Sequence, residues 1–456
     1  MRRLGEWALL ASLAATGCGS WQRVGTGPRP QPGSALPSLA DAGSLYRRLG
    51  FLVAGPPLPF VAAVRYVADA TPDSTLAVFA LSLANHALSF QRDGNTFVAQ
   101  YHVEVAFRAD TAAARQIASD ETVRVRTFQE TLRGDESVIY QQFIGLRPGV
   151  YTVSVTVRDR NNPATTRQEH LDTVPRFAGR ALSSPIPVYQ GPGRSHVADL
   201  PKLLVNPRAT LPYGADTLRF YIEAYGLPSG VRLAARGFDQ SGAEVAHDTV
   251  ALVGDGRFGS TQFAFRPGDL SVGEGSVEVA ALLPEGGAPP SVRAPFVVSF
   301  SDQWAITNFD EMINLLRYFD RQNWVDSLRK AAPEERAQVW RRFYKATDPV
   351  AMTPENEALD QYFRRVQIAN ERFRESGDPG WLTDRGEVFI TLGEPDDVFD
   401  ASSDVSRSGV RLIRWSFTAL RLTLFFQDQT GFGRFRLTPM SRAEYQRVLS
   451  RVRRGQ

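Results

Sequence analysis

The sequence predicts a multidomain chain with two all-β, immunoglobulin-like sandwich domains followed by an α+β domain, in which helices precede a small antiparallel sheet. Three observations support this fold class. Apolar and polar residues alternate from about residue 60 to residue 300, helical spacing follows, and short alternating segments return near the C-terminus. The 456 residues suffice for about three domains of ordinary size.

The first 18 residues have the layout of a lipoprotein signal peptide. Two arginines at positions 2 and 3 precede a mostly apolar stretch, residues 4–15, which is shorter than the ~20 residues that span a bilayer. Residues 13–18 (LAATGC) resemble a bacterial lipobox, in which the cysteine thiol carries a lipid such as palmitate. Cys18 is the single cysteine of the chain and has no internal disulfide partner. The resemblance implies a lipoprotein anchored through an acylated Cys18.

Residues 19–58 are predicted to form a tether between the membrane and the folded domains. They are rich in Pro and Gly and poor in apolar residues, apart from a short helix expected near residues 44–52. Gly19, and not Asp, follows Cys18. By resemblance to the sorting pattern of Gram-negative lipoproteins, this residue favours the outer membrane.

Two blocks of alternating segments predict the sandwich domains, at residues 59–180 and 190–300. Residues 97–107 and 151–157 alternate in the first block, and residues 218–224, 231–235 and 277–283 do so in the second. Such alternation is typical of antiparallel strands with one buried face, and turn sequences containing Gly or Pro separate the strands.

The α+β domain is predicted over residues 301–456. Apolar residues at three- and four-residue steps predict helices at 310–319, after Pro333, and at 355–375. Four short strands are expected near residues 388–392, 413–417, 422–426 and 435–437. The last segment, residues 440–454, is predicted to be a basic helix that either ends in solvent or contacts anionic headgroups or a partner.

An ordered set of motifs marks the junction between the long helix and the small sheet. It reads GWLTDRG at 380–386, LGEPDDV at 392–398, RWSF at 414–417 and FFQD at 425–428. This set resembles the GWxTD domain, a module of bacterial secreted and lipid-anchored proteins named for the motif at 380–384. The resemblance covers about residues 310–440. It implies a leader and β-domains before the module, and no assigned reaction.

The motif residues form a candidate structural motif or partner groove. Gly380 is expected to need a backbone without a Cβ, and Trp381 is expected to bury its ring under the corner between helix and sheet. The full candidate set is Gly380, Trp381, Thr383, Asp384, Arg385, Gly386, Gly393, Pro395, Asp396, Trp415 and Asp428.

Polar residues of the motif are expected to fix its turn. Thr383 and Asp384 are suited to accepting hydrogen bonds from nearby backbone N–H groups. Arg385 is expected to pair with Asp384, Asp396 or Asp397.

The sequence carries no pattern that points to a metal, a cofactor or nucleic acid. There is no H-x-x-x-H, cysteine pair or G-x-S-x-G, and the net charge is only +3. Asp384, Asp396, Asp397 and Asp428 could gather as a carboxylate cluster, but their spacing matches no EF-hand loop. The five histidines are scattered through the β-domains: His86, His102, His170, His196 and His247.

These observations favour a non-enzymatic, lipid-anchored protein of the cell envelope that acts as a binding or scaffold module, with an envelope protein as its partner. One alternative is an envelope hydrolase that uses carboxylates near Asp384 and Asp396, which would have to face each other across a concave site. Another is an accessory subunit of an outer-membrane assembly, secretion or motility apparatus, an alternative that rests only on the predicted location.

Overall fold

The computed structural model describes most of the chain from residue 42 to residue 454. Within that range the undescribed residues are 110–111, 132–136, 214–216, 266–269, 271, 284–288, 300–308, 333–334, 351–355, 376–377 and 401–410. Cys18, the predicted leader and residues 19–41 of the predicted tether lie outside the described residues. The described residues fall into two compact units, one within residues 36–360 and one within residues 361–456.

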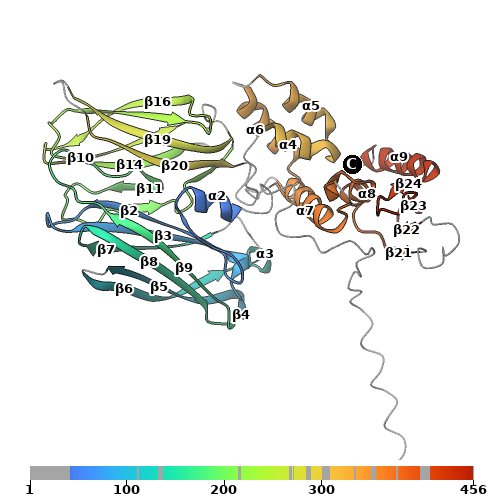
Figure 1. Cartoon of the computed structure of the whole chain (residues 1–456), viewed down its shortest axis with the longest axis horizontal. Helices are drawn as coiled ribbons and strands as arrows, with labels where there is room; N and C mark the ends of the chain where they lie inside the picture. The colour runs from blue at the N-terminus through green and yellow to red at the C-terminus, as the bar shows by residue number, and fades with distance from the viewer. Residues whose placement is uncertain are drawn as a thin grey trace, which may run out of the picture. The chain divides into compact units, whose positions relative to one another are not determined.

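The first β-sandwich consists of two antiparallel sheets that share an apolar core. One sheet has the order β1-β2-β3-β7, and the other has the order β4-β5-β8-β9 with β6 also paired to β5 (Figure 1). Phe79, Tyr101 and Val155 are among the fully buried residues between them. The elements are α2 (Ala42–Arg48), β1 (Leu52–Ala54), β2 (Phe60–Ala68), β3 (Thr75–Ala84), η1 (Asn85–Ala87), β4 (Gln91–Asp93), β5 (Thr96–Ala109), β6 (Ala112–Val125), α3 (Phe128–Thr131), β7 (Ser137–Leu146), β8 (Gly149–Asp159) and β9 (Thr165–Val174).

The second β-sandwich repeats this two-sheet plan. One sheet has the order β12-β11-β14-β18-β17 with β10 paired to β14, and the other has the order β13-β20-β19-β15-β16. All pairs are antiparallel except β13 with β20. The strands are β10 (Ala181–Leu182), β11 (Ile186–Gly193), β12 (Lys202–Val205), β13 (Thr210–Pro212), β14 (Leu218–Tyr225), β15 (Arg232–Phe238), β16 (Glu244–Ala251), β17 (Val253–Gly254), β18 (Phe258–Phe265), β19 (Gly273–Leu282) and β20 (Ser291–Ser299).

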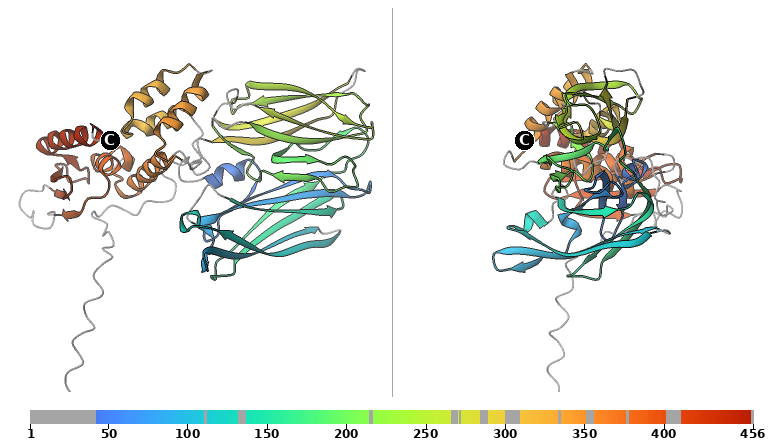
Figure 2. Two further views of the ribbon diagram at one scale, coloured as in Figure 1. Left: turned by 180° about the vertical axis from the view of Figure 1, so that it is seen from behind. Right: turned by 90° about the vertical axis from the view of Figure 1, so that its left-hand side faces the viewer.

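The two sandwiches share a third apolar layer, because the sheet that contains β2 and β3 is covered on both faces. Val67 and Val78 pack against Ile186, Val188 and Tyr221 of the second sandwich. All ten residues of β3 are buried. The sheets that carry β2–β3 and β11–β14 lie next to each other in both views (Figures 1 and 2). Four sheets are therefore stacked, and the sandwiches are not separated by a linker.

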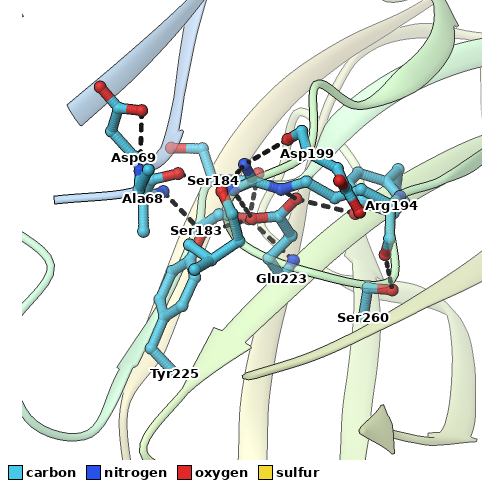
Figure 3. A network of polar contacts seen from close by, with 12 residues as sticks. Ala68, Asp69, Ser183, Ser184, Arg194, Asp199, Glu223, Tyr225 and Ser260 are labelled. Atoms are coloured by element: carbon cyan, nitrogen blue, oxygen red, sulfur yellow. Dashed lines mark hydrogen bonds and ion pairs between the residues drawn. The ribbon is translucent and has the colours of Figure 1, made fainter. Parts of the chain in front are cut away.

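A buried ion pair between Arg194 and Glu223 of the second sandwich lies at the seam where the two sandwiches meet (Figure 3). The Arg194 side chain also donates to the carbonyl oxygen of Ala68, at the end of β2, over 2.6 Å. The backbone N–H of Ala68 in turn donates to the Tyr225 hydroxyl over 2.8 Å. The charged pair thus links the two sandwiches through the backbone of one residue.

Helices follow the β-sheets, and a small sheet closes the chain. The helices before residue 360 are α4 (Phe309–Leu315), η3 (Leu316–Tyr318), α5 (Gln322–Lys330) and α6 (Arg336–Thr347). Later elements are α7 (Glu357–Arg372), η5 (Gly380–Leu382), α8 (Asp384–Leu392), β21 (Asp397–Asp400), β22 (Arg411–Phe417), β23 (Leu422–Asp428), β24 (Arg436–Leu437) and α9 (Pro439–Arg454). The last sheet is antiparallel in the order β21-β22-β23-β24. No helix among the described residues is both long enough and apolar enough to span a bilayer.

The predicted fold class is confirmed, but one predicted strand and the end of the predicted tether are wrong. The tether does not extend to residue 58, because β1 pairs with β2 and Leu58 lies in the core of the first sandwich. Residues 388–392 belong to helix α8, and the first strand of the small sheet is β21. Alternation of Val388, Ile390 and Leu392 suggested a strand, yet Phe389 is buried as well. The segment is helical because Thr383 caps its N-terminus and the Gly393 backbone, at φ +86°, ends it.

Candidate functional site

The motif at residues 380–386 forms a 3-10 turn that leads directly into α8. The Thr383 hydroxyl accepts the backbone N–H of Gly386 over 3.1 Å and donates to the carbonyl oxygen of Gly380 over 2.8 Å. One buried side chain therefore caps the helix and closes the turn before it. Its predicted bonding to nearby backbone groups is confirmed.

Both glycines of the motif are needed because backbone segments touch at their positions. A Cβ on Gly386 would lie 2.0 Å from the carbonyl oxygen of Gly380. A Cβ on Gly380 would lie 2.2 Å from the carbonyl oxygen of Ala369 in α7, and the Gly380 N–H donates to the Asn370 side chain. The turn is packed between two helices, and the Trp381 side chain beside it is buried, as expected.

Asp384 connects the start of α8 to the C-terminal elements. Its carboxylate accepts the backbone N–H of Leu437 in β24 over 2.7 Å and pairs with Arg442 of α9 over 2.7 Å. Arg442 also pairs with Glu387, one turn further along α8. The expectation that Asp384 fixes its own turn is too narrow, because it joins segments more than fifty residues apart.

Arg385 pairs with Glu375, so the predicted pairing with Asp384, Asp396 or Asp397 is wrong. Two nitrogens of the guanidinium lie 3.3 and 3.2 Å from the same Glu375 oxygen. The Glu375 side chain is fully buried and that of Arg385 is nearly so. The guanidinium lies over the ring of Phe435, 4.5 Å from its centroid, and beside that of Phe373. Cation–π contacts with these rings therefore stabilise the Arg385 guanidinium in place of further hydrogen bonds.

The Glu375–Arg385 pair is incompletely stabilised. Burial raises the pKa of Glu375, an effect that Arg385 opposes, and burial lowers the pKa of Arg385 against the pull of Glu375. The second Glu375 oxygen has no hydrogen bond within the described residues, and a guanidinium nitrogen of half-exposed Arg436 lies 3.6 Å from it. Arg436 also pairs with Asp378 over 3.2 Å, so it links the buried pair to the surface.

The residues that follow α8 shape the entry into the small sheet. The Arg365 side chain of α7 donates to the carbonyl oxygen of Ile390 near the end of α8, over 3.3 Å. Pro395 is buried, and Asp396 accepts the backbone N–H of Thr418 over 2.6 Å. Asp396 therefore fixes the start of β21 against the turn after β22.

Trp415 and Asp428 are structural members of the sheet. The Trp415 ring lies 5.3 Å from that of Phe373 and 4.8 Å from that of Phe426. The buried Asp428 carboxylate accepts backbone N–H groups from Thr430, Gly431 and Gly433. Burial raises the pKa of Asp428, but these hydrogen bonds outweigh it and leave the pKa below its ordinary value.

The comparison with known families agrees with this geometry. The model of the GWxTD domain matches residues 291–417. The chain contains a GWxTD domain. The match begins in β20, includes the whole motif turn and ends with β22. The small sheet and α9 thus continue beyond the matched part of the GWxTD domain.

Other comparisons are distant or empty. The chain is similar in part to the crystal structure of red sea bream transglutaminase, at 9% identity and a TM-score of 0.16. The similarity covers 54% of this chain and 32% of that one, so the chain spans about a third of the length of that structure. No curated protein matches the chain.

Four charged residues that form ion pairs around the motif were not identified as its partners from the sequence. Glu375 lies five residues before the motif, Glu387 lies in α8, and Arg436 and Arg442 lie fifty or more residues after it. Acidic residues on a helix and arginines in a basic tail give no pairing signal by themselves. Only the fold brings Arg436 and Arg442 beside Asp384.

The carboxylates named for the hydrolase alternative are each engaged internally. Asp384 is bound by Arg442 and a backbone N–H, and Asp396 by a backbone N–H. Asp397 pairs with Arg414 over 3.0 Å. Within the described residues, no group of three or more His, Cys, Asp or Glu side chains could hold a metal ion.

Proposed function

We propose that this protein is a non-enzymatic, lipid-anchored binding or scaffold protein of the cell envelope. In this proposal, the stacked β-sandwiches serve as a spacer and recognition body, and the GWxTD domain docks an envelope protein. The main support is that the polar side chains of the motif bind other residues of the same domain and so favour a structural over a catalytic role. Thr383, Asp384 and Arg385 all have such partners. Their hydrogen bonds and ion pairs hold helices and strands together.

The hydrolase alternative has less support in this geometry. Catalytic carboxylates require a free lone pair aimed at a substrate and a pKa suited to proton transfer. Asp384 is instead neutralised by Arg442, and the Asp396 carboxylate caps a turn. Among the described residues, Glu375 is a buried carboxylate with a raised pKa, and it pairs with Arg385, whose guanidinium lies over two aromatic rings.

The anchor is tested by labelling the protein with a palmitate analogue in growing cells. We expect the wild-type chain to carry the label and the Cys18→Ala variant to lack it. Ala15→Leu is the matched control, because it keeps Cys18 and places leucine three residues before the cysteine, where a lipobox usually has it, and it should keep the label. An unlabelled wild-type chain would contradict the anchor, whether or not the leader is cleaved.

The scaffold role is tested by crosslinking intact envelopes and identifying the crosslinked peptides by mass spectrometry. We expect a protein partner at near-stoichiometric level, with crosslinks to residues 361–456. The Cys18→Ala variant should lose these crosslinks if anchoring places the domain beside its partner. Recovery of the wild-type chain without any such partner would count against the scaffold role.

A further inference from the structure

Helix α9 (Pro439–Arg454) presents one continuous stripe of exposed residues. Its members recur at three- and four-residue steps and therefore share one face of the helix. Those described as exposed on this face are Met440, Ala443, Arg447, Arg451 and Arg454. The stripe is apolar in its first two positions and wholly basic in its last three. We call it the arginine stripe.

The opposite face of α9 is firmly packed, which fixes the direction of the stripe. Tyr445, Val448 and Leu449 are buried, and the helix packs on β23 and α8. The Tyr445 hydroxyl lies 3.0 Å from the Thr391 hydroxyl of α8. The Ser441 hydroxyl accepts the backbone N–H of Phe425 over 2.9 Å. Rotation of α9 would break these contacts, so the stripe faces away from the domain.

The three arginines of the stripe differ from Arg442, which forms ion pairs with Asp384 and Glu387. Arg447 lies 4.0 Å from Glu444, an exposed ion pair that contributes little. Arg451 makes no ion pair or hydrogen bond to another described residue. Arg454 is exposed, although its Nε donates to the carbonyl oxygen of Ser450 over 3.0 Å.

The helix dipole explains only part of this pattern. Cations stabilise a helix near its C-terminus, but the effect fades within the last turn. It accounts for Arg454 and Arg451. Arg447 lies a full turn earlier, in line with both. The single acidic residue of α9, Glu444, borders the stripe three residues before Arg447, so three arginines stand against one glutamate.

We propose that the arginine stripe binds the phosphate headgroups of anionic phospholipids. Guanidinium forks match phosphate oxygens, and three of them at one-turn spacing match a flat negative surface better than a single bound ion. Exposed Met440 adds an apolar contact at the same face. The inference rests on the proposed membrane location, because the lipid anchor would bring the domain to such a surface. A basic patch is a common additional contact between a lipid-anchored protein and an anionic surface.

The test measures cosedimentation of the full-length chain with vesicles. The chain carries Cys18→Ser, so that no acyl chain contributes. We expect binding to vesicles that contain phosphatidylglycerol, little binding to pure phosphatidylcholine, and loss of binding at high salt. The triple variant Arg447→Gln, Arg451→Gln and Arg454→Gln should bind about a hundredfold more weakly, given the usual contribution of each basic residue near an anionic surface.

Two further variants keep the test decisive. Removing the same charge from exposed residues of the β-sandwiches, as in Arg115→Gln, Arg158→Gln and Arg257→Gln, should leave binding unchanged. Arg451→Gln alone should weaken binding roughly fivefold, and it removes no contact to another described residue.

Several outcomes would overturn the inference. These are equal binding to neutral and anionic vesicles, equal binding by the triple variant, or capture of an acidic protein by the stripe without vesicle binding. Palmitate labelling is independent of this assay. A chain that lacks the label but binds anionic vesicles would contradict the proposed anchor and support the stripe.

Discussion

Two buried Arg–Glu pairs, one in each compact unit, differ in how fully their hydrogen bonds are satisfied. All five N–H groups of Arg194 donate: two to Glu223 and three to the carbonyl oxygens of Ala68, Val197 and Asp199. Both Glu223 oxygens also accept a tyrosine hydroxyl. By contrast, Glu375 offers Arg385 a single oxygen at 3.2–3.3 Å.

The pKa shifts of the two arginines have opposite signs. Burial lowers the pKa of Arg194, but its bonds to Glu223 outweigh this and leave the pKa above the ordinary value. For Arg385 burial dominates and the pKa is lowered. The same degree of burial thus yields a well-stabilised charge at the seam of the sandwiches and a poorly stabilised one in the GWxTD domain.

The difference teaches that burial alone does not show whether an ion pair holds two parts of the fold firmly together. Arg194 and Glu223 form a closed network that joins two sandwiches, and it has no unused donor or acceptor. Arg385 and Glu375 keep an unused oxygen beside half-exposed Arg436. A change of charge at Asp378 or Arg436 is therefore expected to alter the electrostatic environment of the Glu375–Arg385 pair.

Glu223→Gln should have the largest effect. It removes the negative charge that balances fully buried Arg194, and we expect a loss of about 3–5 kcal/mol in the free energy of unfolding, measured with denaturant. The matched control is Glu278→Gln, which breaks an exposed pair with Arg236 in the same sandwich and should cost less than about 1 kcal/mol. Similar losses in both variants would show that the buried Arg194–Glu223 pair contributes no more to stability than an exposed one.

Gly386→Ala tests whether the motif turn holds the second pair in place. The added Cβ meets the Gly380 carbonyl oxygen, and relief of this overlap moves the turn that carries Arg385. We expect a loss of up to about 3 kcal/mol in the free energy of unfolding. Gly55→Ala is the control, since its Cβ would meet nothing within 4 Å. An unchanged stability in Gly386→Ala would show that the turn is looser than its packing indicates.

Glu375→Gln should cost less than Glu223→Gln, about 1–3 kcal/mol near neutral pH, because the charge that it removes is poorly stabilised and Arg385 keeps its contacts with the rings of Phe373 and Phe435. The folded-state pKa of Glu375 is raised above its ordinary value of 4.5, so the folded chain holds this proton more tightly than the unfolded chain. The advantage of wild type over the variant is therefore greatest below pH 4.5 and falls as pH rises through the folded-state value.

Asp428→Asn should show the opposite trend, which makes it the control for this titration. Because the pKa of Asp428 is lowered, its advantage over the variant is complete above the ordinary value of 3.8 and is lost as pH falls through the folded-state value. Unfolding free energies measured across this pH range compare both variants. A cost of Glu375→Gln that grows with pH would mean that Arg385 stabilises its partner as well as Arg194 does.

Periodicity predicted most of the fold, because half-buried strands and amphipathic helices leave regular patterns. It failed at residues 388–392, where every position except Leu392 and Thr391 faces the core and a short buried helix has the same composition as a strand. The cap at Thr383 was the decisive signal. It lies inside a motif that was expected to form a turn leading into a strand.

The candidate site was predictable where contacts are local and not where they are distant. Thr383 acts on residues within three positions, and the chemistry of its side chain suggested such a role. Asp428 also acts within five positions, although this role was not predicted. The partners of Asp384 and Arg385 come from other elements. An arginine can reach any carboxylate that the fold brings near, so sequence order could not select Glu375.

The twofold burial of β3 has a consequence for strand register. Val78 faces the core between the sandwiches and Phe79 faces the interior of the first one. Because both faces are apolar, a shift by one residue would exchange one apolar set for another, and the usual penalty against misalignment is small. Thr75 and Ser82 are the polar residues of β3, and the buried Thr75 hydroxyl donates to the carbonyl oxygen of Pro175 over 2.6 Å. Loss of that hydroxyl is expected to permit slipped pairing with β2 and β7.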